Sequence, residues 1–343
     1  MKYDYIIVGQ GIAGSLLAWN LLQKQKKVLV IDEWQPNSSS NIAAGVINPI
    51  TGRKMVKSWM IDDVLPFAKK TYKDIETLLN IHFFFEKDIY KVFTSEEDIQ
   101  LWNKKKKEIE YKDYLGNIIE KSDDTINTAF GIGIIKQTAW MDVPLFISKF
   151  RDYLKTLNCL LEQKFDYNQL KITDTISYLD YDAKHIVFCE GYKAIHNPYF
   201  KDIPFTLAKG EQLLINAELL KTDKLWNKNI FIIPKQENQY SIGSTFVWND
   251  LSDEVTEIGI AELTEKTNKL INVSYDIIEK KAAIRPTMKD RRPILGKHTE
   301  YNLWIFNGMG TKGVSLAPYF SNYFIDCIEN EKEIMEEVSI NRF

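Results

Sequence analysis

The residues best suited to chemistry stand near the start of the chain, where three glycines precede an aspartate. Gly9, Gly11 and Gly14 have the G-x-G-x-x-G spacing of a phosphate-binding turn. The first glycine permits a tight turn, the second lets the backbone approach a pyrophosphate, and the third lets a helix pack closely on a strand. Asp32 follows a second apolar run, where a carboxylate accepts hydrogen bonds from ribose hydroxyls. The pattern predicts a dinucleotide site with its pyrophosphate at a helix N-terminus.

The elements that must position these residues follow from the hydrophobic spacing. Apolar runs at 5–8 and 28–31 are typical of buried strands, and the amphipathic stretch 12–22 between them is typical of a helix. A glycine-rich turn in an ordinary α/β unit is the alternative interpretation. The order of strand, turn, helix, strand and acid favours the dinucleotide unit.

Size and charge narrow the class of protein. The chain has 343 residues, more than a single core usually supports, so we expect two lobes with a cleft between them. Its net charge of −3 indicates no strong general affinity for nucleic acid. The block Lys104–Lys107 is a local exception, but acids flank it on both sides. We interpret it as a solvated helix face, with a patch for an anionic partner as the alternative.

Cysteines and histidines indicate neither a disulfide framework nor a metal site. The cysteines are few and scattered: Cys159, Cys189 and Cys327. The histidines show no metal-ligand spacing: His82, His185, His196 and His298. We therefore expect a reducing, cytoplasmic compartment and no metal. The chain starts on a strand and lacks both a signal-peptide pattern and an apolar run of about 18 residues, so we expect no membrane association.

The rest of the chain alternates between two kinds of structure without a clear linker. Helical spacing occurs in five segments: 62–79, 96–107, 143–157, 255–271 and 315–330. In the third, Asp142 is the expected N-cap and Pro144 lies in the first turn. Strands at 160–165 and 185–189 are expected to return to the nucleotide sheet. Antiparallel strands of a different lobe are expected at 205–207, 212–215, 230–233 and 240–244.

Six segments, in order, resemble a known family. They read GQGIAG with Asp32, AAGVINP, TAWMDVPLF, HIVFCEG, IIPKQENQYSIGST, and AIRPTMKDRRPILG followed by NGMGTKGVSLAP. The chain is similar over roughly residues 3–330 to the D-amino-acid-oxidase-like FAD-dependent oxidoreductases. This family includes glycine oxidase, sarcosine oxidase and the oxidase domain of an enzyme that modifies the wobble uridine of tRNA.

The resemblance implies an α/β fold in two interleaved parts. A Rossmann-like, doubly wound FAD-binding domain is expected from 1–80, 138–202 and 284–343. An antiparallel-sheet substrate domain of α+β character is expected from 81–137 and 203–283.

The resemblance also implies a non-covalent FAD, since no cysteine or histidine occupies a flavin-linking motif. The ADP half would contact Gly9, Gly11, Ile12, Ala13, Gly14, Asp32 and Glu33. The loop Ala44, Gly45 and Val46 would pass beside the dinucleotide, with Gly191 near it. The flavin ring would lie by Gly308, Gly310, Thr311, Lys312, Gly313 and Val314, whose backbone N–H groups stabilise negative charge on the reduced ring.

Arg285 and Lys312 are the residues that the resemblance implies for catalysis. Arg285 would bind the carboxylate of an amino-acid substrate, for which a planar guanidinium that cannot lose its charge at neutral pH is well suited. Lys312 would add positive charge near the flavin. A structural salt bridge and a surface lysine are the respective alternatives. The implied reaction is hydride transfer from the carbon that bears nitrogen to flavin N5, followed by imine hydrolysis, without an assigned general base.

Two departures bear on the substrate, a small-molecule amine or amino acid. Phe231 stands where glycine-oxidase-like relatives have a tyrosine, and Thr311 where they have an arginine, so glycine is a doubtful substrate. The loop GMGTKG looks closer to the tRNA-modifying oxidase domain. A tRNA-directed oxidase is therefore one alternative, and a flavin-binding subunit without turnover is the other.

Overall fold

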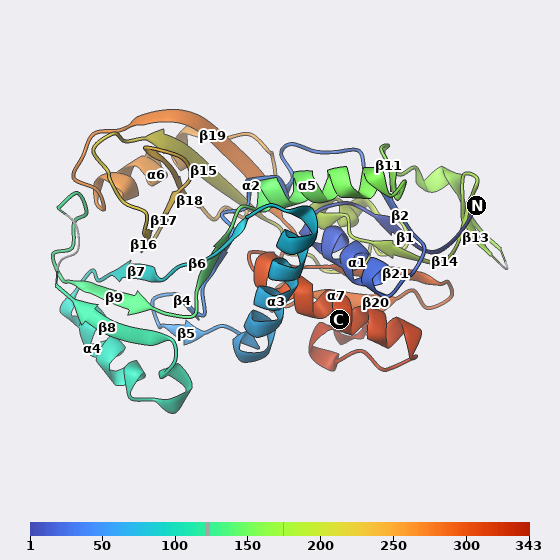
Figure 1. Ribbon diagram of the computed structural model, residues 1–343, viewed down its shortest axis with the longest axis horizontal. Coiled ribbons are helices and arrows are strands. Elements are labelled where there is room, and N and C mark those ends of the chain that lie inside the picture. Colours follow the sequence, from blue (N-terminus) through green and yellow to red (C-terminus); the bar gives the residue numbers. More distant parts are fainter. Residues whose placement is uncertain (121–123, 174) are drawn as a thin grey trace.

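Two sheets side by side dominate the computed structural model, which describes residues 1–120, 124–173 and 175–343 (Figure 1). The nucleotide sheet follows the path β11 (Leu160–Leu161), β2 (Val28–Ile31), β1 (Lys2–Val8), β14 (Tyr181–Phe188) and β21 (Leu303–Asn307). Neighbours along this path are parallel, so their carboxyl ends meet at one edge. Antiparallel strands extend it: β13 (Ile176–Tyr178), β12 (Leu170–Ile172) and β20 (Ile294–Lys297).

Helices pack against this sheet and explain its continuous apolar strands. They are α1 (Ile12–Gln23), α5 (Val143–Thr156) and α7 (Gly313–Glu329), with the short α2 (Ser39–Ile42) beside the loop to β3. α3 (Ile61–Leu79) packs on α7 and on β6 (Phe84–Glu86). In Figure 1, α1 lies between α5 and α7. Asn20 of α1 donates to Ser321 of α7 at 2.7 Å, and Tyr72 of α3 donates to the Val314 carbonyl at 2.7 Å. The second of these buried hydrogen bonds holds the first turn of α7, and the first holds its middle against α1.

The second sheet has a mainly antiparallel order. It runs β19 (Asp276–Arg285), β15 (Ala208–Asn216), β18 (Gln239–Gly243), β17 (Phe231–Pro234), β16 (Leu225–Asn227), β7 (Ile89–Val92), β9 (Ile132–Ile135) and β8 (Leu115–Ile119). The pair β16–β7 is parallel, because these strands come from separate excursions of the chain and no hairpin joins them. α6 (Glu257–Asn268) and α4 (Glu96–Lys106) pack on this sheet.

Short strands join the two sheets. β3 (Val46–Ile47), β10 (Ala139–Met141) and β6 (Phe84–Glu86) form a small antiparallel sheet, and β4 (Ile50–Thr51) pairs with β5 (Val56–Lys57). The small sheet contacts the loop that precedes β3, and it lies where the chain passes from one large sheet to the other (Figure 1). Among the described residues, no helix is both long enough and apolar enough to cross a bilayer.

The α/β prediction with an antiparallel second sheet is confirmed, and the five helices form close to their expected positions. Asp142 caps α5 as expected, accepting from the Leu145 N–H at 3.2 Å. Two of the predicted strands are shorter in the structure than expected. The expected strand 160–165 ends at Leu161 because the chain turns there, and in 205–207 only Phe205 makes a bridge, to Met288.

The predicted domain boundaries remain a prediction. The strands of the second large sheet fall within 81–137 and 203–283, except that β19 continues through Arg285. That overrun matters for the site, because it carries the end of β19 to the cavity between the sheets.

Candidate active site

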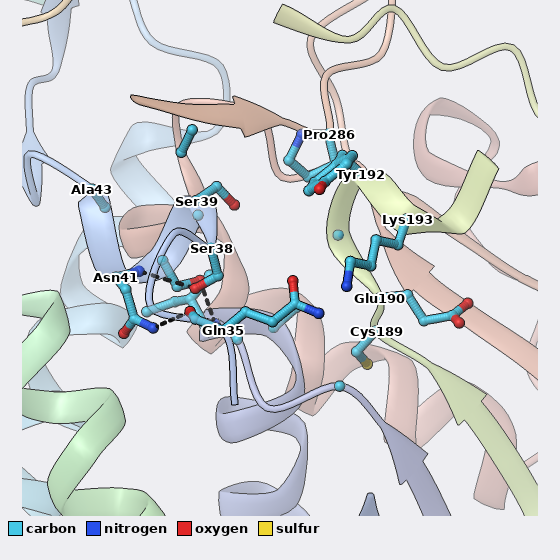
Figure 2. Close-up of a pocket in the computed structure, with 18 of the residues that line it drawn as sticks. Gln35, Ser38, Ser39, Asn41, Ala43, Cys189, Glu190, Tyr192, Lys193 and Pro286 are labelled. Carbon is cyan, nitrogen blue, oxygen red and sulfur yellow. Dashed lines mark hydrogen bonds between the residues drawn. The ribbon is translucent and has the colours of Figure 1, made fainter. Parts of the chain in front are cut away.

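A cavity of about 930 Å³ extends from the carboxyl ends of β1 and β2 to the end of β19. The first part of its wall comes from the glycine turn and Asp32, and the far part comes from Arg285 and the loop that precedes α7. Figure 2 shows how loop 35–43 and segment 189–193 face each other across part of this cavity. Residues that are distant in sequence therefore line the same cavity.

The N-terminus of α1 opens onto this cavity, where its N-cap residue supplies no side-chain cap and the Ile12 N–H donates to Ser40 Oγ at 2.9 Å. Gly11 is the N-cap residue, and Gly11, Ile12 and Ala13 line the wall. Gly9 has φ +100°, and a Cβ placed on it would lie 2.5 Å from the Cys189 carbonyl oxygen. A Cβ on Gly14 would lie 1.9 Å from the Gly9 oxygen, so this glycine serves the close packing of α1 and does not itself line the cavity. The exposed helix N-terminus suits an anion.

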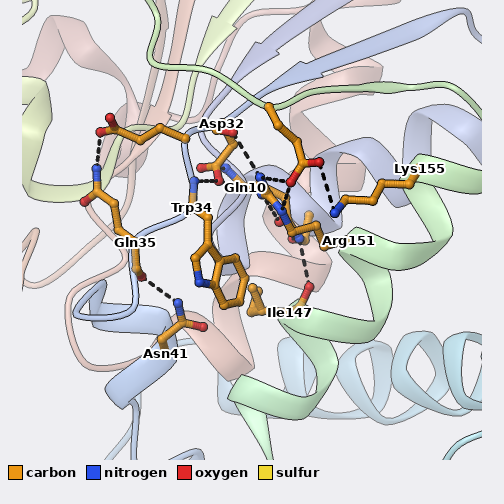
Figure 3. Close-up of polar contacts among 11 residues, drawn as sticks. Gln10, Asp32, Trp34, Gln35, Asn41, Ile147, Arg151 and Lys155 are labelled. Atoms are coloured by element: carbon orange, nitrogen blue, oxygen red, sulfur yellow. Dashed lines mark hydrogen bonds and ion pairs between the residues drawn. The ribbon is translucent and has the colours of Figure 1, made fainter.

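Asp32 is held by a buried network (Figure 3). Its Oδ2 accepts from the Gln10 N–H at 2.9 Å, and its Oδ1 accepts from the Trp34 N–H at 2.8 Å and from Arg151 Nη1 at 2.7 Å. These bonds occupy three of the roughly four acceptor sites of a carboxylate, leaving one for a ribose hydroxyl. Arg151 also donates to the Asp32 carbonyl at 3.0 Å and to Glu162 at 3.1 Å.

Two further acids lie beside Asp32 in the cavity wall. Glu33 pairs with Lys193 at 2.9 Å, and this bond lowers the pKa of its carboxyl group. Glu190 accepts from the Tyr167 hydroxyl and from Asn197 Nδ2, yet burial raises the pKa of its carboxyl group. Gly191, with φ +59°, follows at the same wall as expected. The nucleotide end of the cavity is thus rich in fixed acceptors.

The loop before β3 passes beside the cavity, and Ala44, Gly45 and Val46 line it. Gly45 has φ +78°, and a Cβ there would lie 1.9 Å from the Met141 carbonyl oxygen, so only glycine fits without displacement. Nearby, Asn41 donates to the Gln35 carbonyl, while its own Oδ1 is buried without a hydrogen-bond partner. A buried orphan acceptor in a cavity wall suits a ligand that donates.

The loop before α7 contributes Gly310 and Thr311 to the wall, and the first two residues of α7, Gly313 and Val314, also line it. The N-terminus of α7 has no side-chain cap. Gly308 does not line the cavity; its φ of +74° turns the chain behind it.

Lys312 lies outside the wall as well. Its Nζ contacts Ser58 Oγ at 3.3 Å, and burial lowers the pKa of its ammonium group. Its side chain therefore extends away from the cavity, and a charge role beside the flavin remains a prediction.

Arg285, the last residue of β19, reaches the far end of the cavity. Its Nη2 donates to Ser244 Oγ at 2.6 Å and to the Thr245 carbonyl at 3.3 Å, and Nη1 donates to the Lys209 carbonyl at 3.3 Å. Gly210 makes room for it, since a Cβ there would lie 1.7 Å from Nη2.

No acid compensates this cation. Among residues 1–120, 124–173 and 175–343, no carboxylate oxygen lies within 4.0 Å of the Arg285 guanidinium, and its contacts are to neutral oxygens and the Phe246 ring. Burial lowers the pKa of the guanidinium to about 10, so it stays charged at neutral pH. A structural salt bridge, the alternative interpretation, is therefore wrong, and the cavity has an uncompensated cation that suits a carboxylate.

Sequence reasoning missed several contributors. Arg151 follows Ile147 and precedes Leu154 on the buried stripe of α5, and a charge at such a position signals a buried partner. Gln10, at a variable position of the glycine motif, is buried and accepts from Arg151 at 2.9 Å. Segment 163–168 also lines the cavity, where a longer strand was expected. The mostly polar residues of 162–168, which follow the apolar pair Leu160–Leu161, are the sequence feature that could have indicated a loop here.

Comparison with known proteins agrees with this site. The family model described as FAD dependent oxidoreductase matches residues 4–326. The chain therefore belongs to this family of flavoenzymes, and its cofactor is FAD.

Particular relatives are distant but extend over nearly the whole chain. Glycine oxidase of Bacillus subtilis is 22% identical, with 98% of this chain and 95% of that protein covered. The bifunctional protein MnmC of Pseudoalteromonas translucida, named for tRNA 5-methylaminomethyl-2-thiouridine biosynthesis, is 22% identical, but only 57% of it is covered. The crystal structure of glycine oxidase from Geobacillus kaustophilus superposes with a TM-score of 0.82 at 17% identity, covering 97% of this chain and 96% of that one.

The wall fits FAD on features of this structure. The other N–H groups at the N-terminus of α1, beside the Ile12 N–H that Ser40 accepts, suit the pyrophosphate. Asp32 suits a ribose, and the uncapped N-terminus of α7 suits negative charge on the flavin. The unpartnered Asn41 acceptor adds a polar contact that a bound cofactor would satisfy. Both ends lie in one cavity, as an extended dinucleotide requires.

Proposed function

We propose that the protein oxidises the C–N bond of an amino acid or a carboxylated secondary amine. The observation that carries this proposal is the uncompensated Arg285 guanidinium in the cavity that also contains the phosphate-binding turn. The FAD, when bound, supplies the hydride acceptor. The imine that leaves is hydrolysed by water.

The residues of the chain would bind and orient the substrate. Arg285 uses three of its five N–H groups on protein oxygens, so Nε–H and one Nη1–H stay available for a carboxylate. Fixing the carboxylate fixes the distance of the reacting C–H bond from the cofactor, which is where an oriented site gains rate. None of the four histidines stands on β15, β17, β19 or loop 308–314, so we assign no general base.

The wall near Arg285 disfavours glycine as the substrate. Phe231 lines it without a hydroxyl group, and Thr311 adds no charge. Gln212 is the other polar side chain from this sheet that lines the same end. A substrate with an apolar group beside its carboxylate suits this wall better than one with none, because it covers Phe231.

Anaerobic reduction of the bound flavin tests the proposal. The purified protein would be mixed with amino acids and N-alkyl amino acids, each paired with the amine that lacks only the carboxylate. We expect bleaching of the flavin absorbance by some carboxylated members and much weaker reduction by their partners. Absence of reduction by any member would favour the flavoprotein without turnover. If both members of a pair reduced the flavin equally fast, Arg285 would not be the residue that binds the substrate carboxylate.

The tRNA-directed alternative rests on the likeness to MnmC and on the lysine block. In the structure, Lys104–Lys107 lies at the end of α4 and contributes nothing to the cavity wall. Lys105 pairs with Glu108, and Lys106 donates to Asn117. We therefore favour a small-molecule substrate, and propose the cytoplasm as the compartment because all three cysteines are unpaired. Retention of tRNA that weakens as salt rises would instead support the alternative.

A further inference from the structure

Two charged side chains with no solvent exposure stand on β15, on the face that turns away from the cavity. Lys209 and Glu211 are each 0% exposed. Side chains alternate along a strand, and Gly210 and Gln212, between and after them, line the cavity. Burying a charge is costly unless it is paired and hydrogen-bonded, so these residues need a structural or functional reason.

The two charges lie 3.7 Å apart, Lys209 Nζ to Glu211 Oε1, and their other partners belong to one segment, residues 244–256, which we call the arm; it joins β18 to α6 (Figure 1). Lys209 Nζ lies 2.5 Å from Asp250 Oδ2 and 3.0 Å from Ser252 Oγ. Glu211 accepts from the Thr256 N–H at 2.7 Å and from Thr245 Oγ1 at 3.2 Å. Lys209 and Glu211 thus bind the arm at three places: near its start at Thr245, in its middle at Asp250, and at its end at Thr256.

The same arm orients the Arg285 guanidinium from the other side. Ser244 Oγ and the Thr245 carbonyl accept from Nη2, and the Phe246 ring lies 4.9 Å from the guanidinium carbon. The Lys209 carbonyl accepts both from Arg285 and from the Val247 N–H, the latter at 3.0 Å. Thr245 is therefore fixed to Glu211 through its hydroxyl and to Arg285 through its carbonyl.

We propose that Lys209 and Glu211, together with Asp250, are positioning residues that hold the arm and so aim Arg285 at the substrate carboxylate. This inference rests on the proposed function. Arg285 has no acid to fix its direction, and its orientation depends on neutral oxygens, two of which the arm supplies. When the arm is released, the guanidinium loses these acceptors and its remaining N–H groups no longer point to one place.

Ligand binding to the FAD-loaded protein tests this. Asp250→Asn keeps side-chain volume, alters a side chain that is 35% exposed and leaves Lys209 its second ion partner, Glu211, at 3.7 Å; Lys209→Met removes the cation itself. Benzoate, titrated against the flavin absorbance, probes the carboxylate site directly. We expect its Kd to rise about tenfold in both variants, as expected when hydrogen bonds to a charged group are misaligned. FAD retention should change less than about twofold, because neither residue lines the cavity.

Lys281→Met is the matched control. Lys281 stands on the neighbouring strand β19 and pairs at the surface with Glu279, 2.8 Å away. Benzoate affinity should equal that of the unaltered protein in this variant.

The outcomes separate the inference from the proposed function. Unchanged benzoate affinity in Asp250→Asn and Lys209→Met would overturn the inference, and so would equal weakening of an amino acid and its carboxylate-free amine. If Lys209→Met does not fold, Asp250→Asn decides alone. An unaltered protein that binds no carboxylate would overturn the proposed function, and the inference with it.

Discussion

Arg151 and Asp32 meet at 2.7 Å, in a pairing that joins α5 to the carboxyl end of β2 (Figure 3). The Arg151 side chain is 6% exposed and also contacts Gln10 and Glu162. A single buried guanidinium thus ties the glycine turn and Asp32, the acid expected to bind a ribose, to one helix. The acid therefore has a fixed orientation at the cavity, and its side chain loses little conformational entropy when the cofactor binds.

Arg151→Met should weaken FAD binding and lower thermal stability. Removing one partner of a buried ion pair leaves Asp32 uncompensated, which costs about 3–5 kcal/mol of folding free energy. The apparent Kd for FAD should rise about tenfold, because Asp32 loses one of its three fixed bonds. FAD fluorescence quenching on reconstitution of the apoprotein measures it. Lys155→Met, on the same helix and also paired with Glu162, is the control and should bind FAD normally.

Arg285→Met should abolish the preference for carboxylated substrates. A charge-assisted contact to a carboxylate is worth about 2–5 kcal/mol when water is excluded, so kcat/KM should fall at least about 30-fold. Oxidation of the corresponding carboxylate-free amines should stay within about threefold. Arg285→Lys should rescue only part, because an ammonium group lacks the planar fork. Arg53→Met, an exposed arginine outside the cavity, is the control. Equal losses for acids and amines would contradict the assignment.

Carboxylate binding should fall at high pH. Burial lowers the pKa of Arg285 to about 10, which means that the cationic form is complete at neutral pH and is lost as pH rises through about 10. The Kd of benzoate should therefore be constant between pH 7 and 9 and rise about tenfold per pH unit above 10. Asp250 does not contribute, since its carboxyl pKa is lowered to about 2 by Lys209 and it stays ionised throughout. A flat profile to pH 11, with circular dichroism unchanged, would contradict this.

Local sequence signals were sufficient to expect the glycine turn and Asp32 at one wall of the cavity, and insufficient to expect the surroundings of Arg285 at the other end. Gly9, Gly11 and Gly14 were readable because each is required by a close backbone approach within one short unit. Arg285 was found through resemblance, while its lack of an acidic neighbour depends on three segments that meet only in the folded chain: β15, β19 and the arm.

The contributors that were missed share a physical reason. Arg151 and Lys209 are charged residues in otherwise ordinary helix and strand patterns, and their partners lie in other segments. Hydrophobic periodicity identifies the buried face of a helix or strand, but it does not identify the segments that pack against that face. The parallel pair β16–β7 escaped prediction for the same reason, since no hairpin turn connects the two strands.

Phe231→Tyr should broaden the substrate range toward smaller amino acids. Phe231 begins β17, opposite Gly243, and its ring lines the cavity that Arg285 also lines. A hydroxyl there adds a donor to a carboxylate that the guanidinium already holds, and one such hydrogen bond to a charged group is worth about 1.5–3 kcal/mol. KM for glycine should therefore fall about tenfold, with little change in FAD affinity. Phe231→Leu, which removes the ring without adding a donor, separates polarity from space. If KM for glycine falls equally in both variants, room near the carboxylate rather than the missing hydroxyl limits glycine oxidation.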